Sequence, residues 1–236
     1  MPPMKRTITV ITMALVAATL LALPATAAEG TERRAKCTIV GTNGDDLLVG
    51  TAGNDIICGL KGDDTIHGLA GDDVLKGGPG RDEMRGHKGD DRVVGGERRD
   101  LLWGDGGNDV VKGGKGNDRI RGYTGNDVLR GNAGNDVIRA GSGDDTISGN
   151  DDNDTIRGMG GADTIDAGDG DDRVVGGSDA DQIIGGDGDD ELFGRDGDDT
   201  IDAVDGVSGN DLANGGNDGN DTCTGDVGDT LNDCEL

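Results

Sequence analysis

The sequence predicts an all-β protein, a right-handed parallel β-roll (a β-solenoid) of about nine 18-residue coils with a cap at each end. A nine-residue unit, Gly-x-x-Gly-(Asp/Asn)-Asp-x-aliphatic-x, recurs eighteen times from Gly41 to Asp202 without a change of register. Position six of the unit is always Asp, and position eight is always Leu, Ile, Val or Met. The 236 residues include one Trp, one Tyr and one Phe, too few large side chains for a conventional core.

Each position of the repeat has a structural reason. Glycine at positions one and four supplies a positive φ or allows a close approach of the main chain to another group. The x-aliphatic-x triplet suits a very short strand whose middle side chain faces opposite to its two neighbours. One turn and one strand make half a coil, so two repeats close a coil. The aliphatic side chains then meet between two parallel sheets.

Composition alone favours disorder, because the net charge is −26 and only 32% of the residues are hydrophobic. The regular spacing of the apolar residues argues for order instead. Two states remain open: an ordered solenoid, or a chain that must bind a ligand before it becomes ordered.

The aspartates at position six carry the chemistry. In a stack of coils they form a ladder of like charges along each edge at a spacing of about 4.8 Å, which is destabilising. A divalent cation would neutralise this ladder. Ca²⁺ accepts six to eight carboxylate and carbonyl oxygens in loose geometry, whereas Mg²⁺ demands a tight octahedron. Two edges of nine repeats leave eight gaps each, so we expect multiple Ca²⁺ ions, up to about sixteen.

The repeat resembles the calcium-binding nonapeptide of RTX, or haemolysin-type, proteins, and clean copies are GTAGNDIIC at 50–58 and GLAGDDVLK at 68–76. The resemblance implies a parallel β-roll with Ca²⁺ between successive turns, held by position-six aspartates and turn carbonyls. The chain looks like the secreted repeat proteins of Gram-positive actinobacteria. The ligands implied are Asp46, Asp55, Asp64, Asp73, Asp82, Asp91, Asp109, Asp118, Asp127, Asp136, Asp145, Asp163, Asp172, Asp190 and Asp199.

Three copies depart from the pattern, because Arg98, Asp152 and Asp179 replace the glycine at position four. Arg81 also replaces the usual Asp or Asn at position five, which weakens its site. We expect ions to be missing at the position-six residues of the three departing copies, which are Asp100, Asp154 and Asp181.

The eighteen aliphatic side chains bury too little apolar surface to offset the conformational entropy of 162 ordered residues. We therefore expect the calcium-free chain to be largely disordered and Ca²⁺ to drive its folding. The alternative is a metal-independent solenoid with exposed acidic turns.

Residues 1–27 have the pattern of a secretory signal peptide, with Lys5 and Arg6 before an apolar stretch and a small-residue cleavage site at 25–27. A membrane anchor is the alternative, although the apolar stretch is short and contains threonines. We expect a secreted, extracellular protein that does not span a membrane once the signal is removed.

The four cysteines lie in two pairs, Cys37 and Cys58 near one end and Cys223 and Cys234 near the other. In an exported protein they predict two disulfides. Of the three pairings we favour Cys37–Cys58 and Cys223–Cys234, because a solenoid keeps its ends apart. A zinc site is the alternative, but no histidine lies near either pair.

Cys37 falls at position six of a repeat extended backwards, whereas Cys58 is at position nine, so the N-terminal end must depart from the regular geometry. We expect residues 28–40 to form an N-terminal cap and residues 203–236 a C-terminal cap that covers the last apolar layer.

No catalytic constellation is recognisable, and His67 and His87 occupy outward positions, so we expect no enzyme. The alternative function is adhesion to an anionic cell-wall polymer or polysaccharide through a basic stripe on one outer sheet face. The opposing interpretation is that the stripe only keeps that face soluble. Nucleic acid does not suit the strongly negative chain. The stripe consists of Arg85, Trp103, Arg121, Arg139 and Arg157, at eighteen-residue spacing.

Overall fold

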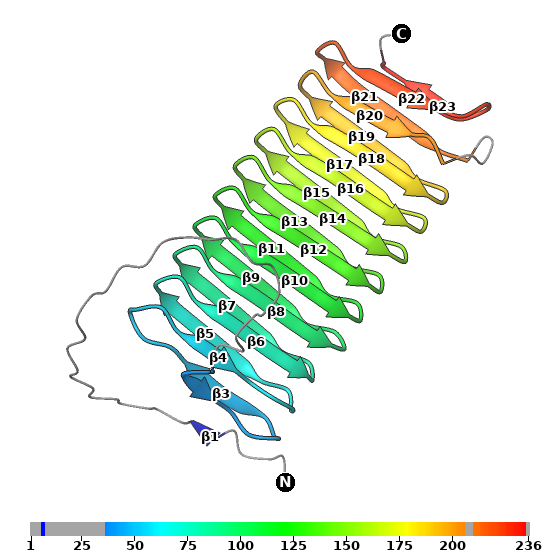
Figure 1. Cartoon of the computed structure of the whole chain (residues 1–236). Helices are drawn as coiled ribbons and strands as arrows, with labels where there is room; N and C mark the ends of the chain where they lie inside the picture. Colours follow the sequence, from blue (N-terminus) through cyan, green and yellow to red (C-terminus); the bar gives the residue numbers. More distant parts are fainter. Residues whose placement is uncertain (1–5, 8–35, 206–209, 235–236) are drawn as a thin grey trace, which may run out of the picture.

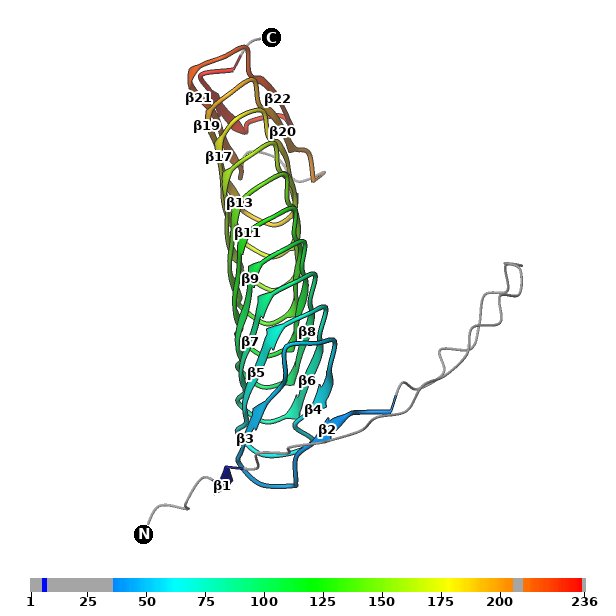
Figure 2. The same ribbon diagram turned by 90° about the vertical axis from the view of Figure 1, so that its left-hand side faces the viewer.

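The computed structural model describes residues 6–7, 36–205 and 210–234, and it shows a long stack of short strands (Figure 1). Two parallel sheets face each other along the stack, and successive strands of the chain alternate between them (Figure 2). Neighbouring strands of one sheet are related by eighteen residues, as in the pair Val110 and Val128. The described residues therefore form an all-β parallel roll, as predicted.

Within the described residues, sheet A has twelve strands and sheet B has eleven. Sheet A contains β1 (Arg6–Thr7), β3 (Asp46–Val49), β5 (Thr65–Ala70), β7 (Glu83–Lys88), β9 (Leu101–Gly106), β11 (Arg119–Thr124), β13 (Val137–Ser142), β15 (Thr155–Gly160), β17 (Arg173–Ser178), β19 (Glu191–Asp196), β21 (Leu212–Asp218) and β23 (Thr230–Asn232). Sheet B contains β2 (Ile39–Val40), β4 (Ile56–Cys58), β6 (Val74–Pro79), β8 (Arg92–Glu97), β10 (Val110–Lys115), β12 (Val128–Ala133), β14 (Thr146–Asp151), β16 (Thr164–Asp169), β18 (Gln182–Asp187), β20 (Thr200–Ala203) and β22 (Thr222–Gly225).

The core is a single layer of aliphatic side chains between the sheets. Every position-eight residue from Leu48 to Ile201 is at most 1% exposed. The layer begins one repeat earlier than expected, because Ile39 pairs in register with Ile57 and is 7% exposed. The segment 38–40 thus forms a regular half-coil within the predicted N-terminal cap.

The strands are longer than the expected three residues, because most of them span six. In β10 the triplet Val110–Lys112 is followed by residues at positions one to three of the next repeat, and Gly114 still pairs with Asn132 of the next coil. The turn therefore consists only of positions four to six.

Positive φ occurs at position four, as one of the two expected reasons for glycine, and also at position two, which was not expected. Tyr123 at position two has a φ of 82° and Gly125 at position four has 119°. Glycine at position one is needed for space instead. A Cβ on Gly77 would stand 2.1 Å from Oδ2 of Asp82 and 2.8 Å from the carbonyl oxygen of Gly95. Position one is thus a close approach between main chain and carboxylate.

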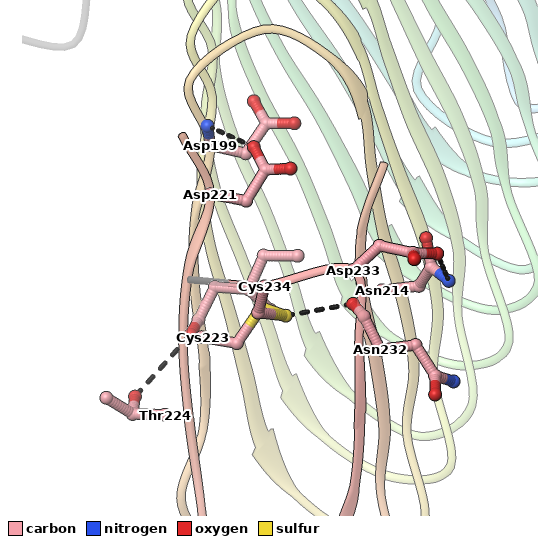
Figure 3. The surroundings of a disulfide bond; sticks show 9 residues. Asp199, Asn214, Asp221, Cys223, Thr224, Asn232, Asp233 and Cys234 are labelled. Atoms are coloured by element: carbon pink, nitrogen blue, oxygen red, sulfur yellow. Dashed lines mark hydrogen bonds between the residues drawn. A yellow bond between two sulfur atoms is a disulfide. The ribbon is translucent and has the colours of Figure 1, made fainter. Parts of the chain in front are cut away.

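Both ends carry a disulfide, in the pairing favoured from the sequence. Cys37 is bonded to Cys58 across 21 residues, and Cys223 to Cys234 across 11 residues (Figure 3). The C-terminal segment is more than a cap, since β21, β22 and β23 extend both sheets after an insertion. Residues 210–234 therefore continue the roll.

The predicted signal peptide lies almost wholly outside the described residues. Its two described residues form β1, and Arg6 pairs with Asp46 of β3. Among the residues that the structure describes, no helix has the length and apolar character needed to cross a membrane.

Candidate metal-binding edges

The position-six aspartates stack along both edges of the roll and are at most 8% exposed. From Asp64 to Asp199, each places Oδ1 against the main-chain N–H of the position-six aspartate eighteen residues earlier. The N–H of Asp82, for example, donates to Oδ1 of Asp100 over 2.8 Å, and that of Asp100 donates to Oδ1 of Asp118 over 2.8 Å. The ladder predicted from the period is therefore present, with its carboxylates turned inward.

The second oxygen of these carboxylates has no partner. From Asp64 to Asp199, Oδ2 of every position-six aspartate is buried without a hydrogen bond. Only the first two copies differ, because the N–H and hydroxyl of Thr51 donate to Oδ2 of Asp55 over 2.7 and 2.9 Å, and Thr42 does the same for Asp46. A buried charged oxygen without a partner is strongly destabilising. Each of these oxygens therefore requires a cation or a proton.

The pKa values of the position-six aspartates from Asp64 to Asp199 are raised, because these carboxylates are buried without a counter-charge. Burial raises the pKa of Asp82 and Asp91 to about 7 and that of Asp100 and Asp154 to about 8. The main-chain hydrogen bond to each carboxylate opposes this rise, and the charges of neighbouring aspartates add to it. Without a counter-charge, the stacked carboxylates are poorly tolerated as anions near neutral pH.

The donor set fits a hard divalent cation. In the described part of the chain, no group of three or more His, Cys, Asp or Glu side chains is placed to hold an ion. Main-chain carbonyls must therefore complete any calcium site, and Ca²⁺ accepts such mixed oxygen sets. Position-one glycines provide the necessary access. At Gly77 a carboxylate oxygen of Asp82 and the carbonyl of Gly95 both lie within 3 Å of the place that a Cβ would take.

The three irregular copies keep the geometry of the others. Arg98, Asp152 and Asp179 hold the position-four conformation, with φ values of 76°, 74° and 75°. The aspartates of these copies are equally buried, and their Oδ2 atoms are also without partners. The expected loss of ions there thus depends on side-chain charge in the turn and stays a prediction.

Position five forms a second ladder, which sequence reasoning did not anticipate. Oδ1 of its Asp or Asn accepts the main-chain N–H of the same position one coil later, as in Asn126 N–H to Asn108 Oδ1 at 2.8 Å. On one edge this chain of bonds runs from Asn54 to Ala162. These bonds hold successive turns in register and explain the preference for Asp or Asn.

The aspartate ladder also continues beyond the regular repeats. The N–H of Asp190 donates to Oδ1 of Asp211 over 2.9 Å. The N–H of Asp199 donates to Oδ1 of Asp221 over the same distance of 2.9 Å (Figure 3). Insertions lengthen these two steps to 21 and 22 residues, so Asp211 and Asp221 do not fall at position six of the nine-residue period and were not predicted as members of the ladder. The Gly-Asn-Asp triplets at 209–211 and 219–221 were the available signal.

The predicted basic stripe lies on the outer face of sheet A. Strand register places Arg85, Trp103, Arg121, Arg139 and Arg157 on successive strands. The guanidinium of Arg85 lies 4.5 Å from the centre of the Trp103 ring, and the last three arginines are exposed. The only tyrosine and phenylalanine of the chain also lie in sheet A, in β11 and β19.

Comparison with known proteins finds one family. Overlapping stretches match the RTX calcium-binding nonapeptide repeat, at residues 38–66, 59–93, 85–120, 112–147, 121–156, 148–183 and 175–212. No curated protein matches the chain. The matched stretches run without a gap from residue 38 to residue 212, well over half of the chain. The chain therefore belongs to the RTX calcium-binding repeat family, whose repeats imply calcium binding by a β-roll.

Proposed function

We propose that this protein is a secreted calcium-binding repeat protein whose folding is driven by multiple Ca²⁺ ions held along both edges of the roll. One observation carries the proposal: from Asp64 to Asp199 the edges present an unbroken series of buried carboxylate oxygens without hydrogen-bond partners. Ions that bind only the stacked coils stabilise the folded state by mass action.

The proposed ligands are the fifteen aspartates inferred from the repeat, together with Asp211 and Asp221, which occupy the same ladder. Bound Ca²⁺ would supply positive charge between neighbouring carboxylates. Position-one glycines admit the carbonyl oxygens that complete the coordination, and the position-five ladder keeps the turns aligned. The two disulfides, which suit an oxidising compartment, support the secreted location.

Circular dichroism and calorimetry on the chain without residues 1–27 test the proposal. We expect the strand signal to appear on adding Ca²⁺ and to disappear with EGTA. A strand signal that chelation leaves unchanged would refute calcium-driven folding.

A pair of charge-matched variants tests the ligands. Asp118→Asn removes a carboxylate from the middle of one ladder, and Asp166→Asn removes an exposed one from the outer face of sheet B. We expect Asp118→Asn to lower the calcium stoichiometry and to raise the calcium concentration at the folding midpoint. Asp166→Asn should match the parent chain. Equal behaviour of the two variants would remove position six from the ligand set.

Adhesion through the outer face of sheet A is a second candidate function. The observation that favours it is a shallow depression lined by Arg121, Tyr123, Arg139 and Met159, where Nη1 of Arg121 lies 3.3 Å from the Tyr123 hydroxyl. Exposed guanidinium groups beside an aromatic ring suit carboxylate-bearing sugars, because Arg binds carboxylates bidentately and the ring offers an apolar face.

Retention on an anionic polysaccharide in saturating Ca²⁺ tests this second function. We expect the combined variant Arg121→Gln, Arg139→Gln and Arg157→Gln to lose retention. Arg130→Gln, an exposed arginine at position nine in sheet B, is the control. Retention that is the same in both variants and in the parent chain would leave the stripe with a solubilising role only.

A further inference from the structure

The two histidines of the chain, separated by twenty residues, meet on the outer face of sheet A. His67 is at position nine in β5, and His87 is at position two in β7. Strand register pairs His67 with Arg85 and His87 with Leu69, so the imidazoles are diagonal neighbours on adjacent coils. Both are only partly buried, and neither belongs to the aspartate ladders.

The separation of their nitrogens matches that of two ligands of one metal ion. Nδ1 of His67 lies 3.3 Å from Nε2 of His87, and the ring planes are inclined by 36°. Two nitrogens on a tetrahedral ion, each at about 2.0–2.1 Å, are about 3.3–3.4 Å apart. A direct N–H···N hydrogen bond fits the same distance, and the experiment below separates the two arrangements.

The surroundings of His87 orient it as a ligand. Its Nδ1 lies 3.5 Å from Oδ2 of Asp105 on the next strand of the sheet. A carboxylate at Nδ1 favours the tautomer with the proton on that atom, which leaves a lone pair on Nε2 directed toward His67. This is the outer-shell arrangement that commonly supports metal-binding histidines.

The charges around the pair admit a cation. Burial lowers the pKa of His67, with smaller contributions from His87 and Arg85, so the neutral form that binds metals is favoured. Glu83 and Asp105 act in the opposite direction on His67. Arg85 has its guanidinium against the Trp103 ring. Lys88 also lines the adjoining depression, so two carboxylates and two cationic side chains leave the surroundings close to neutral.

We propose that Nδ1 of His67 and Nε2 of His87 bind one transition-metal ion on the outer face of sheet A, with Asp105 as a positioning residue. Imidazole ligands select Cu²⁺, Zn²⁺ or Ni²⁺ over Ca²⁺, and Cu²⁺ binds most strongly in this series. A shallow depression lined by Leu69, His87 and Asp105 leaves room for the water molecules that complete the coordination. This site is chemically distinct from the oxygen-lined edges.

Cu²⁺ is the probe, added to the full chain in saturating Ca²⁺ and followed by calorimetry and electron paramagnetic resonance. We expect one Cu²⁺ of highest affinity, with superhyperfine coupling to two nitrogen nuclei. His67→Thr and His87→Asn should each weaken binding at least 10-fold and leave coupling to a single nitrogen. Asn is chosen because it tolerates the φ of 81° at His87.

Asp105→Asn tests the positioning role, and we expect it to weaken Cu²⁺ binding about 10–100-fold while two-nitrogen coupling is retained. Asp166→Asn on sheet B controls for the loss of one negative charge. Circular dichroism establishes that each variant has the parent strand content. Copper bound without nitrogen coupling, or equally tightly by both histidine variants, would overturn the proposal and leave the imidazole hydrogen bond as the explanation.

Discussion

We predict that protonation of the buried aspartates stabilises the folded roll in the absence of Ca²⁺. Ca²⁺ is first removed with EGTA at pH 8 and the chain is moved into calcium-free buffer, because EGTA is protonated in acid and releases Ca²⁺. The perturbation is then a change from pH 8 to pH 5, which titrates the aspartate ladders. Below pH 6 the buried carboxylates gain protons and lose their mutual repulsion. We therefore predict that the calcium-free chain, largely disordered at pH 8, acquires strand structure on acidification.

The sign and the size follow from the buried carboxylates. Burial raises the pKa of Asp82, Asp91 and Asp109 from 3.8 to about 7. Because these pKa values are higher in the folded state, that state binds more protons between about pH 4 and pH 7, and the free energy of unfolding falls as pH rises through this window. A difference of about three pKa units corresponds to about 4 kcal/mol per aspartate above pH 8. Neighbouring carboxylates titrate together, so this value does not multiply by their number.

Far-UV circular dichroism in calcium-free buffer between pH 8 and pH 5 measures the effect, with a parallel series in Ca²⁺. The series stops above the sequence pI of about 4.1, and sedimentation velocity excludes association. We expect a cooperative gain of strand signal near pH 6 to 7 without Ca²⁺ and a flat profile in Ca²⁺. A strand signal that stays constant or declines on acidification without Ca²⁺ would refute the reasoning.

Three further predictions concern single positions. Gly77→Ala should lower the free energy of unfolding in Ca²⁺ by about 1–3 kcal/mol, because its Cβ would stand 2.1 Å from a carboxylate oxygen of Asp82. The control is Gly53→Ala, whose Cβ would have no atom within 4 Å, and its calcium titration should match that of the parent chain. Arg98→Gly replaces a side chain held at a φ of 76° by glycine, which adopts that φ freely, and removes a positive charge from the turn. We expect calorimetry to count more calcium ions per chain. An unchanged count would contradict a role for that charge. Replacing Cys223 and Cys234 by serine removes a disulfide that closes an 11-residue loop and should lower the free energy of unfolding in Ca²⁺ by about 2–3 kcal/mol. We expect amide hydrogen exchange to become faster first in the residues after position 200. Equal exchange along the whole chain would contradict a stabilising effect confined to this end.

Much of the roll could be predicted from the sequence because each coil contacts only its neighbours. A nine-residue period therefore determines which residues share an edge, a face or the core. The buried aliphatic layer at position eight and the stacking of Arg121 on Arg139 follow directly from it. The pairing of Cys223 with Cys234 could be favoured for the same reason, since contacts in a solenoid are local.

Three features of the roll could not be predicted from the sequence, because they depend on backbone geometry and on contacts between coils. Glycine appears at position one for space and at position four for its φ, and the sequence shows the same residue for both reasons. Asp211 was missed because an insertion moved it out of the period, although its hydrogen bond to the preceding coil is unchanged. The position-five ladder was missed because its side chains bond to main-chain groups one coil away.

The sequence by itself determined the period, the chemistry of each position and the need to neutralise two acidic edges, because these follow from repeated residue types. Only the tertiary structure decided which carboxylate oxygen is satisfied by an N–H and which is left without a partner. It also brought His67 and His87 within 3.3 Å of each other. The period gives the strand register, but the contact between the two imidazoles also depends on the direction of each side chain across the sheet, which a nine-residue period does not specify.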